Sequence, residues 1–185
     1  TVYFEKPGPE NSADCLGIVQ RMVQAGAKHV VVASTRGETG LLFARGLPAG
    51  KANLVVVAHS AGFAKPGEVE FDPEKRGLIE ERGGQVLQAT MPFHSVENGI
   101  EKKFSGTLPT SLVAHTLRIF GQGAKVGCEI VMMAADAGLI SEGEEAVAVG
   151  GTRWGADTVL VVRSAASRRF LDLKVLEIAA KPREW

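Results

Sequence analysis

The chain has few of the residues that build metal centres and disulfide frameworks. It contains two cysteines, Cys15 and Cys128, which are far apart and form no C-x-x-C pair, and only four histidines. No two histidines stand at positions i and i+4, and no cysteine or carboxylate completes the spacing of a zinc ligand set. We therefore expect two buried thiols and no metal site.

Motifs of several common enzyme classes are also absent. The G-x-x-x-x-G-K-[ST] loop of nucleoside triphosphatases and the G-x-S-x-G elbow of serine hydrolases do not occur. Gly121, Gly123 and Gly127 resemble a dinucleotide-binding fingerprint, but their spacing differs and a predicted helix precedes them instead of a strand. We interpret these glycines as a joint between two helices.

An excess of one charge and a long apolar run are missing as well. Lys and Arg number 21, Asp and Glu number 21, and the formal net charge is zero. No overall positive field therefore favours nucleic acid or an anionic membrane, and the local cluster of Arg163, Arg168 and Arg169 is predicted to be a solvated loop.

No run approaches the roughly 20 apolar residues of a membrane span. No leader sequence is recognisable, so we expect a cytoplasmic protein without a membrane or nucleic-acid partner.

What the chain does contain is an alternation of strand and helix patterns. Its 185 residues favour one domain, residues 1–185, and 45% of them are hydrophobic. Periodicity predicts helices at residues 13–24, after residue 35, from 73 to about 82, from 109 to about 120, and at 124–137. Strands are predicted at residues 2–4, 30–33, 53–58, 85–89, 146–149, 158–162 and 174–178. The segment from residue 90 to 106 is predicted to be a long loop.

This alternation indicates an α/β fold with a mainly parallel sheet and helices on both faces. The last two strands have no long helix between them, so we expect an antiparallel pair or an edge there.

The segment of residues 34–39, Ser-Thr-Arg-Gly-Glu-Thr, lies between a predicted strand and a predicted helix. The first amide groups of a helix lack intrahelical partners, and the helix dipole adds positive potential at that end. Together with nearby hydroxyls and Arg36, they predict a site for a phosphorylated ligand. Alternatively, Thr35 and Glu38 fit a capping box, which would only stabilise the helix.

Three further strand ends carry small or polar residues. In open α/β sheets, ligands bind beyond the carboxyl ends of the strands. Together with the 34–39 segment, residues 59–62, 90–95 and 150–152 therefore predict a crevice for a small molecule. His59 and His94 lie at this edge, whereas His29 and His115 are expected to be structural. We expect Asp136 and Asp157 to have structural roles as hydrogen-bond acceptors. Asp157 is expected to fix the loop after Thr152.

Several motifs together resemble stand-alone proteins that are similar to the C-terminal α/β domain of pyruvate kinase. They are Tyr3-Phe4-Glu5-Lys6-Pro7-Gly8, Val32 to Thr39, Lys103-Phe104-Ser105-Gly106, Lys125-Val126-Gly127 with Glu129, Ala134 to Gly138, and Gly155-Ala156-Asp157-Thr158. The resemblance implies a three-layer α/β/α fold with a mixed sheet of about five core strands. In allosteric pyruvate kinases this domain is regulatory, and a Ser/Thr-Gly loop binds a sugar-bisphosphate phosphate. The catalytic barrel of pyruvate kinase, with its metal and phosphoenolpyruvate sites, has no counterpart here.

The resemblance also implies that the cofactor is flavin mononucleotide (FMN), which members of the stand-alone family can carry. We expect a binding protein for a phosphorylated ligand, most favourably FMN, and no catalytic residue is assigned. The expected binding residues are Ser34, Thr35, Arg36, Gly37, Glu38, Thr39, His59, Gly62, Phe63, His94, Gly151 and Thr152.

Three alternatives stay open: a regulatory module that senses a sugar phosphate or nucleotide for a partner enzyme, a phosphatase or lyase that uses His59 or His94, and assembly into a homo-oligomer.

Overall fold

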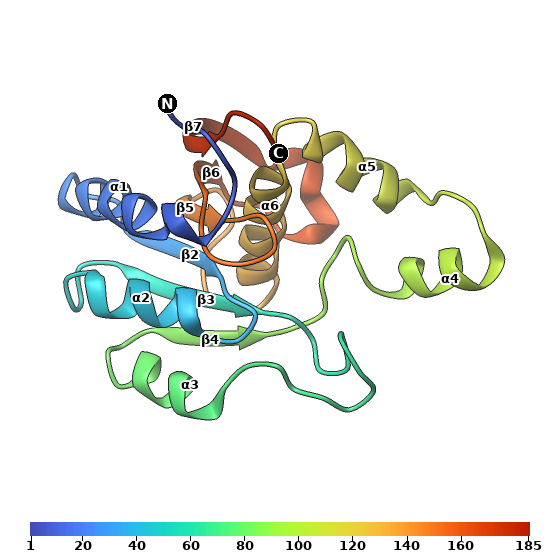
Figure 1. Cartoon of the computed structure of the whole chain (residues 1–185), viewed down its shortest axis with the longest axis horizontal. Coiled ribbons are helices and arrows are strands. Elements are labelled where there is room, and N and C mark those ends of the chain that lie inside the picture. Colours follow the sequence, from blue (N-terminus) through green and yellow to red (C-terminus); the bar gives the residue numbers. More distant parts are fainter.

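A seven-stranded mixed sheet forms the centre of the molecule (Figure 1). The computed structural model describes every residue from Thr1 to Trp185. The strands are β1 (Val2–Phe4), β2 (His29–Ala33), β3 (Asn53–Ala58), β4 (Gln85–Gln88), β5 (Glu145–Gly150), β6 (Thr158–Arg163) and β7 (Lys174–Pro182). The helices are α1 (Ser12–Gln24), α2 (Glu38–Gly46), α3 (Pro73–Glu80), α4 (Val96–Phe104), α5 (Pro109–Arg118) and α6 (Gln122–Asp136), with short 3₁₀ helices at Pro9–Asn11 and Ser167–Asp172.

The strand order is β1-β7-β6-β5-β2-β3-β4. Strands β5, β2, β3 and β4 are parallel, whereas β6 runs antiparallel to both β5 and β7. The predicted α/β class and the antiparallel final pair are therefore confirmed. The sheet has more strands than the expected core of about five, because β6, β7 and the three-residue β1 all join it. Strand β4 lies at one edge of the sheet.

Helices cover both faces of the sheet. Val30 and Val32 of β2 belong to one apolar cluster with Phe43 of α2 and residues of α1 and α3. Val31 between them points to the other face, where it packs with Val131 of α6. Since side chains alternate along a strand, a continuous apolar run is what a strand buried on both faces requires.

Helix α4 lies in the segment predicted to be a loop, so that prediction was wrong. Glu97 is in its first turn, and Lys102 and Lys103 are in its last turn, where these charges complement the helix dipole. None of its residues is buried. Val96, Ile100 and Phe104 nevertheless recur at every fourth residue, a helical pattern that the loop prediction overlooked. Figure 1 shows α4 and α5 extending away from the sheet.

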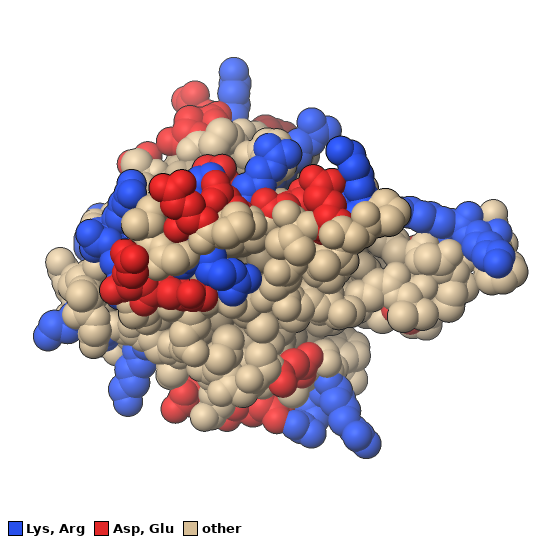
Figure 2. Space-filling view, turned by 90° about the horizontal axis from the view of Figure 1, so that it is seen from below, with Lys and Arg blue, Asp and Glu red and all other residues tan.

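Charged groups on the surface are mixed in sign. On the face in Figure 2, basic and acidic side chains lie interspersed, and neither forms a continuous patch. The arginines predicted to share a solvated loop are divided: Arg163 ends β6 and pairs with Glu145, while Arg169 lies in a 3₁₀ helix and pairs with Glu142.

Two further features of the chain are its helix lengths and its thiols. No helix combines the length and the apolarity needed to cross a bilayer. Cys15 and Cys128 are buried free thiols, as predicted, and burial raises their pKa values to about 12 and about 11.

The packing of α2 on the sheet leads to a stability prediction. A Cβ atom at Gly40 would lie 2.5 Å from Cγ1 of buried Val56, whereas one at Gly77 of α3 would meet nothing within 4 Å. We expect Gly40→Ala to lower the free energy of unfolding by about 1–3 kcal/mol through overpacking. Gly77→Ala should raise it by about 0.4–1 kcal/mol, because alanine favours the helix. Urea unfolding followed by circular dichroism measures both, and equal effects would contradict this packing.

Candidate functional site

A cavity of about 600 Å³ lies at the carboxyl ends of the parallel strands. The ends of β2 and β3 contribute Ala33, Val57 and Ala58 to its lining, and Gly151 directly follows β5. Nine of the residues predicted to bind a ligand line it: Ser34, Thr35, Arg36, Glu38, Thr39, His59, Phe63, His94 and Gly151. Gly37, Gly62 and Thr152 lie near these residues in the chain but do not line the cavity. The structure thus brings most of the predicted residues together.

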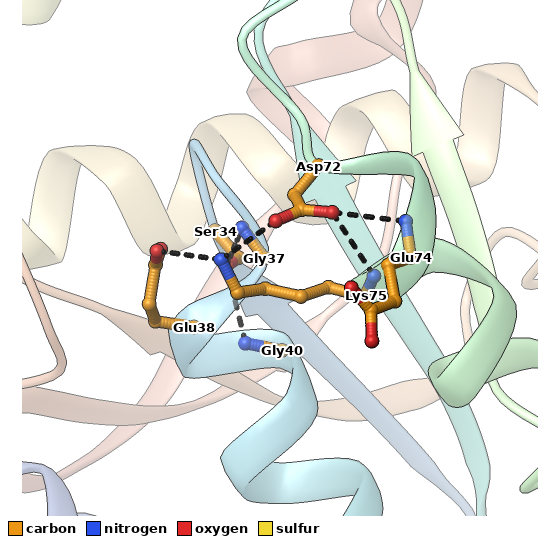
Figure 3. A network of polar contacts seen from close by, with 7 residues as sticks. All are labelled: Ser34, Gly37, Glu38, Gly40, Asp72, Glu74 and Lys75. Carbon is orange, nitrogen blue, oxygen red and sulfur yellow. Dashed lines mark hydrogen bonds and ion pairs between the residues drawn. The ribbon is translucent and has the colours of Figure 1, made fainter.

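Ser34 organises the loop at the start of α2, as Figure 3 shows. Its buried Oγ accepts hydrogen bonds from the amides of Gly37 at 3.2 Å and Gly40 at 3.1 Å. Gly37 is the N-cap, with a φ of 101° that glycine adopts without strain. The predicted capping box of Thr35 and Glu38 is therefore wrong: the helix begins two residues later than that motif requires, and Ser34 supplies the cap.

Three amide groups of this loop remain without a partner in the chain. The N–H groups of Thr35, Arg36 and Thr39 make no hydrogen bond within the protein. They lie at the positive end of α2, and all three residues line the cavity. The Arg36 guanidinium stacks on Trp154 at 4.6 Å from the ring centre. This end of the cavity therefore offers amide donors and a cation to an anionic group.

Lys75 of α3 supports the same loop from outside the cavity (Figure 3). Its Nζ donates to Glu38 Oε1 at 2.9 Å and to Asp72 Oδ2 at 3.1 Å, and Asp72 also caps α3. These hydrogen bonds raise the pKa of Lys75 and lower that of Asp72. Burial opposes the charge of Glu38, but the hydrogen bond from Lys75 prevails and lowers its pKa below the usual 4.5.

Residues 151–155 form a neighbouring part of the rim, where Trp154 meets Arg36, and Asp157 holds this segment in place. Its fully buried carboxylate accepts the amides of Thr152 at 2.9 Å and Gly8 at 3.2 Å, and the hydroxyl of Thr158 at 2.7 Å. The predicted role of Asp157 in fixing this loop is confirmed.

The same segment brings two residues to the cavity that sequence reasoning missed. They are Arg153 and Trp154. Arg153 has a φ of 66°, a left-handed conformation that costs a non-glycine residue about 1–3 kcal/mol. Their position directly after a glycine-rich strand end was the one signal that could have found them.

Helix α6 places a charged cluster on a further wall of the cavity. The Nζ atom of Lys125 contacts the Glu129 carboxylate and lies 2.9 Å from His94 Nδ1. Burial lowers the pKa of Lys125, although Glu129 favours its charged form. Burial also opposes the charge of Glu129, but His94 and Lys125 overcome this and lower its pKa. Of this cluster only His94 was predicted, because Lys125 and Glu129 look like an ordinary surface pair of a helix.

The remaining polar groups divide into cavity residues and structural ones. His59 Nδ1 lies 3.3 Å from Glu70 Oε2, and its ring packs on Phe63. His29 pairs with Glu144 away from the cavity, and Asp136 accepts the amide of Ser167, as the structural roles predicted for them require. No group of three His, Cys, Asp or Glu side chains is arranged to hold a metal ion.

Comparison with protein families agrees with this architecture. The family model described as "Pyruvate kinase, alpha/beta domain" matches residues 13–162. The chain belongs to this family. The match spans α1 to nearly the end of β6, and so includes the 34–39 loop, α6 and the 151–155 rim of this pyruvate kinase α/β-domain protein. Strands β1 and β7 lie outside it.

The pKa shifts around Lys75 predict a pH dependence of stability. Glu38 and Asp72 have lowered pKa values in the folded state, so their stabilising effect is present above their unfolded values of 4.5 and 3.8 and is lost as the pH falls through the folded ones. We expect Lys75→Met to be less stable than the unaltered protein at pH 7, with a difference that shrinks below pH 3.8. Urea titrations at both pH values measure this. Lys51→Met, which removes an exposed lysine without an ion pair, is the control, and a difference that does not vary with pH would contradict the prediction.

Proposed function

We propose that the protein binds a phosphorylated small molecule in this cavity, with the phosphate at residues 34–39. The observation that carries the proposal is the set of unpaired amides of Thr35, Arg36 and Thr39 at the start of α2, beside the Arg36 side chain. Amides and a dipole aimed at one point are the features of a phosphate site at a helix N-terminus. Lys75, Glu38 and Asp72 hold this loop, so the donors are preorganised.

FMN is the ligand that we favour. A cavity of about 600 Å³ is in the range that holds a cofactor of this size. Apolar side chains of Phe63, Met91, Ile130 and Met133 line the part that would surround the ring, close to His59 and His94. When bound, the flavin would supply hydride or electron transfer, while the protein would set its position and electrostatics.

The absorbance of the purified protein tests this proposal directly. A yellow preparation, or quenching of FMN fluorescence on titration with the colourless protein, is the expected result. A colourless protein that leaves FMN fluorescence unchanged would rule out FMN as the ligand.

A second candidate is a module that senses a sugar phosphate or nucleotide for a partner enzyme. It is favoured by apolar residues on the projecting helices, Val96 and Phe104 of α4 and Leu112 of α5, which are 75%, 70% and 61% exposed. Such residues are typical of contact surfaces when they lie together. A thermal shift with phosphosugars in a protein that does not bind FMN would favour this function.

Arg36 provides the sharpest test of the phosphate site. We expect Arg36→Ala to weaken FMN binding by about 1.5–3 kcal/mol, which is roughly ten- to more than a hundredfold, because a charge-assisted hydrogen bond is lost. Isothermal titration measures the affinity. Arg45→Ala, in the last turn of the same helix, is the matched control and should bind normally. Equal affinities of the two variants would show that Arg36 does not bind the phosphate.

A further inference from the structure

The charged cluster of Lys125, Glu129 and His94 is joined by Arg118, the last residue of α5. Lys125 and Arg118 are cations and Glu129 is a carboxylate, but Arg118 does not line the cavity. His94 lies between the cations: its Nδ1 faces Lys125 Nζ at 2.9 Å, and its Nε2 faces Arg118 Nη2 at 3.1 Å. The phosphate proposal uses none of the charges of this cluster, so the presence of Lys125 and Glu129 in the cavity wall needs another reason.

The cluster has hydrogen-bond donors to spare but few acceptors. The Lys125 ammonium has three N–H groups, and its only hydrogen-bond partners in the chain are Glu129 and His94, while the centre of the Phe93 ring lies 5.4 Å from Nζ. At least one N–H group therefore lacks a hydrogen-bond acceptor, although the side chain is only 2% exposed. The acceptors of Glu129 are engaged by Lys125 and by the amide of Phe93 at 2.9 Å. A buried donor without an acceptor is costly, so a ligand oxygen is the group that would complete this wall.

The cavity joins this cluster to the proposed phosphate site. Helix α2 packs in the apolar cluster on one face of the sheet, and α6 packs in the apolar cluster on the other face. Residues from the starts of both helices line the same cavity, which therefore crosses the carboxyl edge of the sheet. One ligand lying across this edge would contact Arg36 with one end and the wall of Lys125 and His94 with the other.

We propose that Lys125, held by Glu129 and flanked by His94 and Arg118, binds a second electron-rich oxygen of the ligand. The ligand is thus a phosphate ester whose other end presents an electron-rich oxygen, such as a carboxylate or a pyrimidine carbonyl of FMN. This inference rests on the proposed phosphate site and specifies the class of molecule that fills the cavity. The wall offers N–H donors of a cation, and hydrogen bonds from an ammonium to a carboxylate are charge-assisted, so a hydroxyl at that position binds more weakly than a carboxylate.

A matched pair of probes isolates this end of the cavity. The probes 6-phosphogluconate and glucitol 6-phosphate have the same carbon chain and phosphate, and differ in a terminal carboxylate against a hydroxymethyl group. Isothermal titration of the full chain should show at least tenfold tighter binding of 6-phosphogluconate. In Lys125→Met/Glu129→Gln, which removes the ion pair without leaving a buried charge, the two affinities should agree within about twofold.

Arg36→Ala serves as the control for the opposite end. It should weaken both probes by the same factor and leave their ratio unchanged. Arg118→Met is the second variant, and it does not disturb the buried pair of Lys125 and Glu129. If the double variant does not fold, Arg118→Met should still reduce the preference for the carboxylate, because it removes one of the two cations.

The outcomes separate this inference from the proposed function. Equal binding of the two probes by the unaltered protein, or a preference that survives in the double variant, would overturn the inference while phosphate binding stands. Binding of FMN that is equally tight in the double variant would also overturn it, because Lys125 would then contact no oxygen of the ligand. Failure of both probes and of FMN to bind would overturn the phosphate site itself.

Discussion

The parallel pairing of β5, β2, β3 and β4 is the constraint on which the site depends. Parallel strands end at the same edge, so the segments that follow them meet there although they are far apart in the sequence. Helices on the two faces then start at this edge, α2 from one side and α6 from the other. A cavity between the strand ends and the helix starts follows from this arrangement.

Hydrogen bonds from backbone amides to buried side-chain oxygens fix the segments that line this edge of the sheet. Ser34 fixes the turn into α2, and Asp157 ties the segment after β5 to the N-terminal segment at Gly8. Both use oxygen acceptors to satisfy amides that would otherwise be buried without partners. The amides that stay free, those of Thr35, Arg36 and Thr39, are consequently held in place by their neighbours and need little reorganisation to meet an anion.

The ion pair of Lys125 and Glu129 is a different kind of feature. Its two charges lie one helical turn apart and are almost fully buried, which is energetically expensive unless further partners stabilise them. His94, the Phe93 amide and the Phe93 ring provide such partners. An apolar pair of similar volume would stabilise α6 at least as well, so stability alone does not account for charges at this position.

Much of the secondary structure could be predicted because its signals are local. Asp72 before Pro73, the apolar runs of β2 and β3, and the break at Gly121 each specify their own element within a few residues. The 34–39 loop was found for the same reason. Helix α4 was missed although Val96, Ile100 and Phe104 recur at helical spacing, because it is short and its apolar stripe does not face the core. The capping box was wrongly predicted because Ser34, and not Thr35, accepts the amides at the start of α2.

The sequence by itself determined the alternation of strands and helices, the family resemblance and one end of the cavity. Only the tertiary structure decided that β6 and β7 extend the same sheet, that Trp154 faces Arg36, and that Lys125 of α6 shares a cavity with the 34–39 loop. Local sequence patterns predict the secondary structure of a segment and which of its side chains are buried. They do not record which segments the sheet brings together, because contacts between distant residues depend on strand order and helix packing.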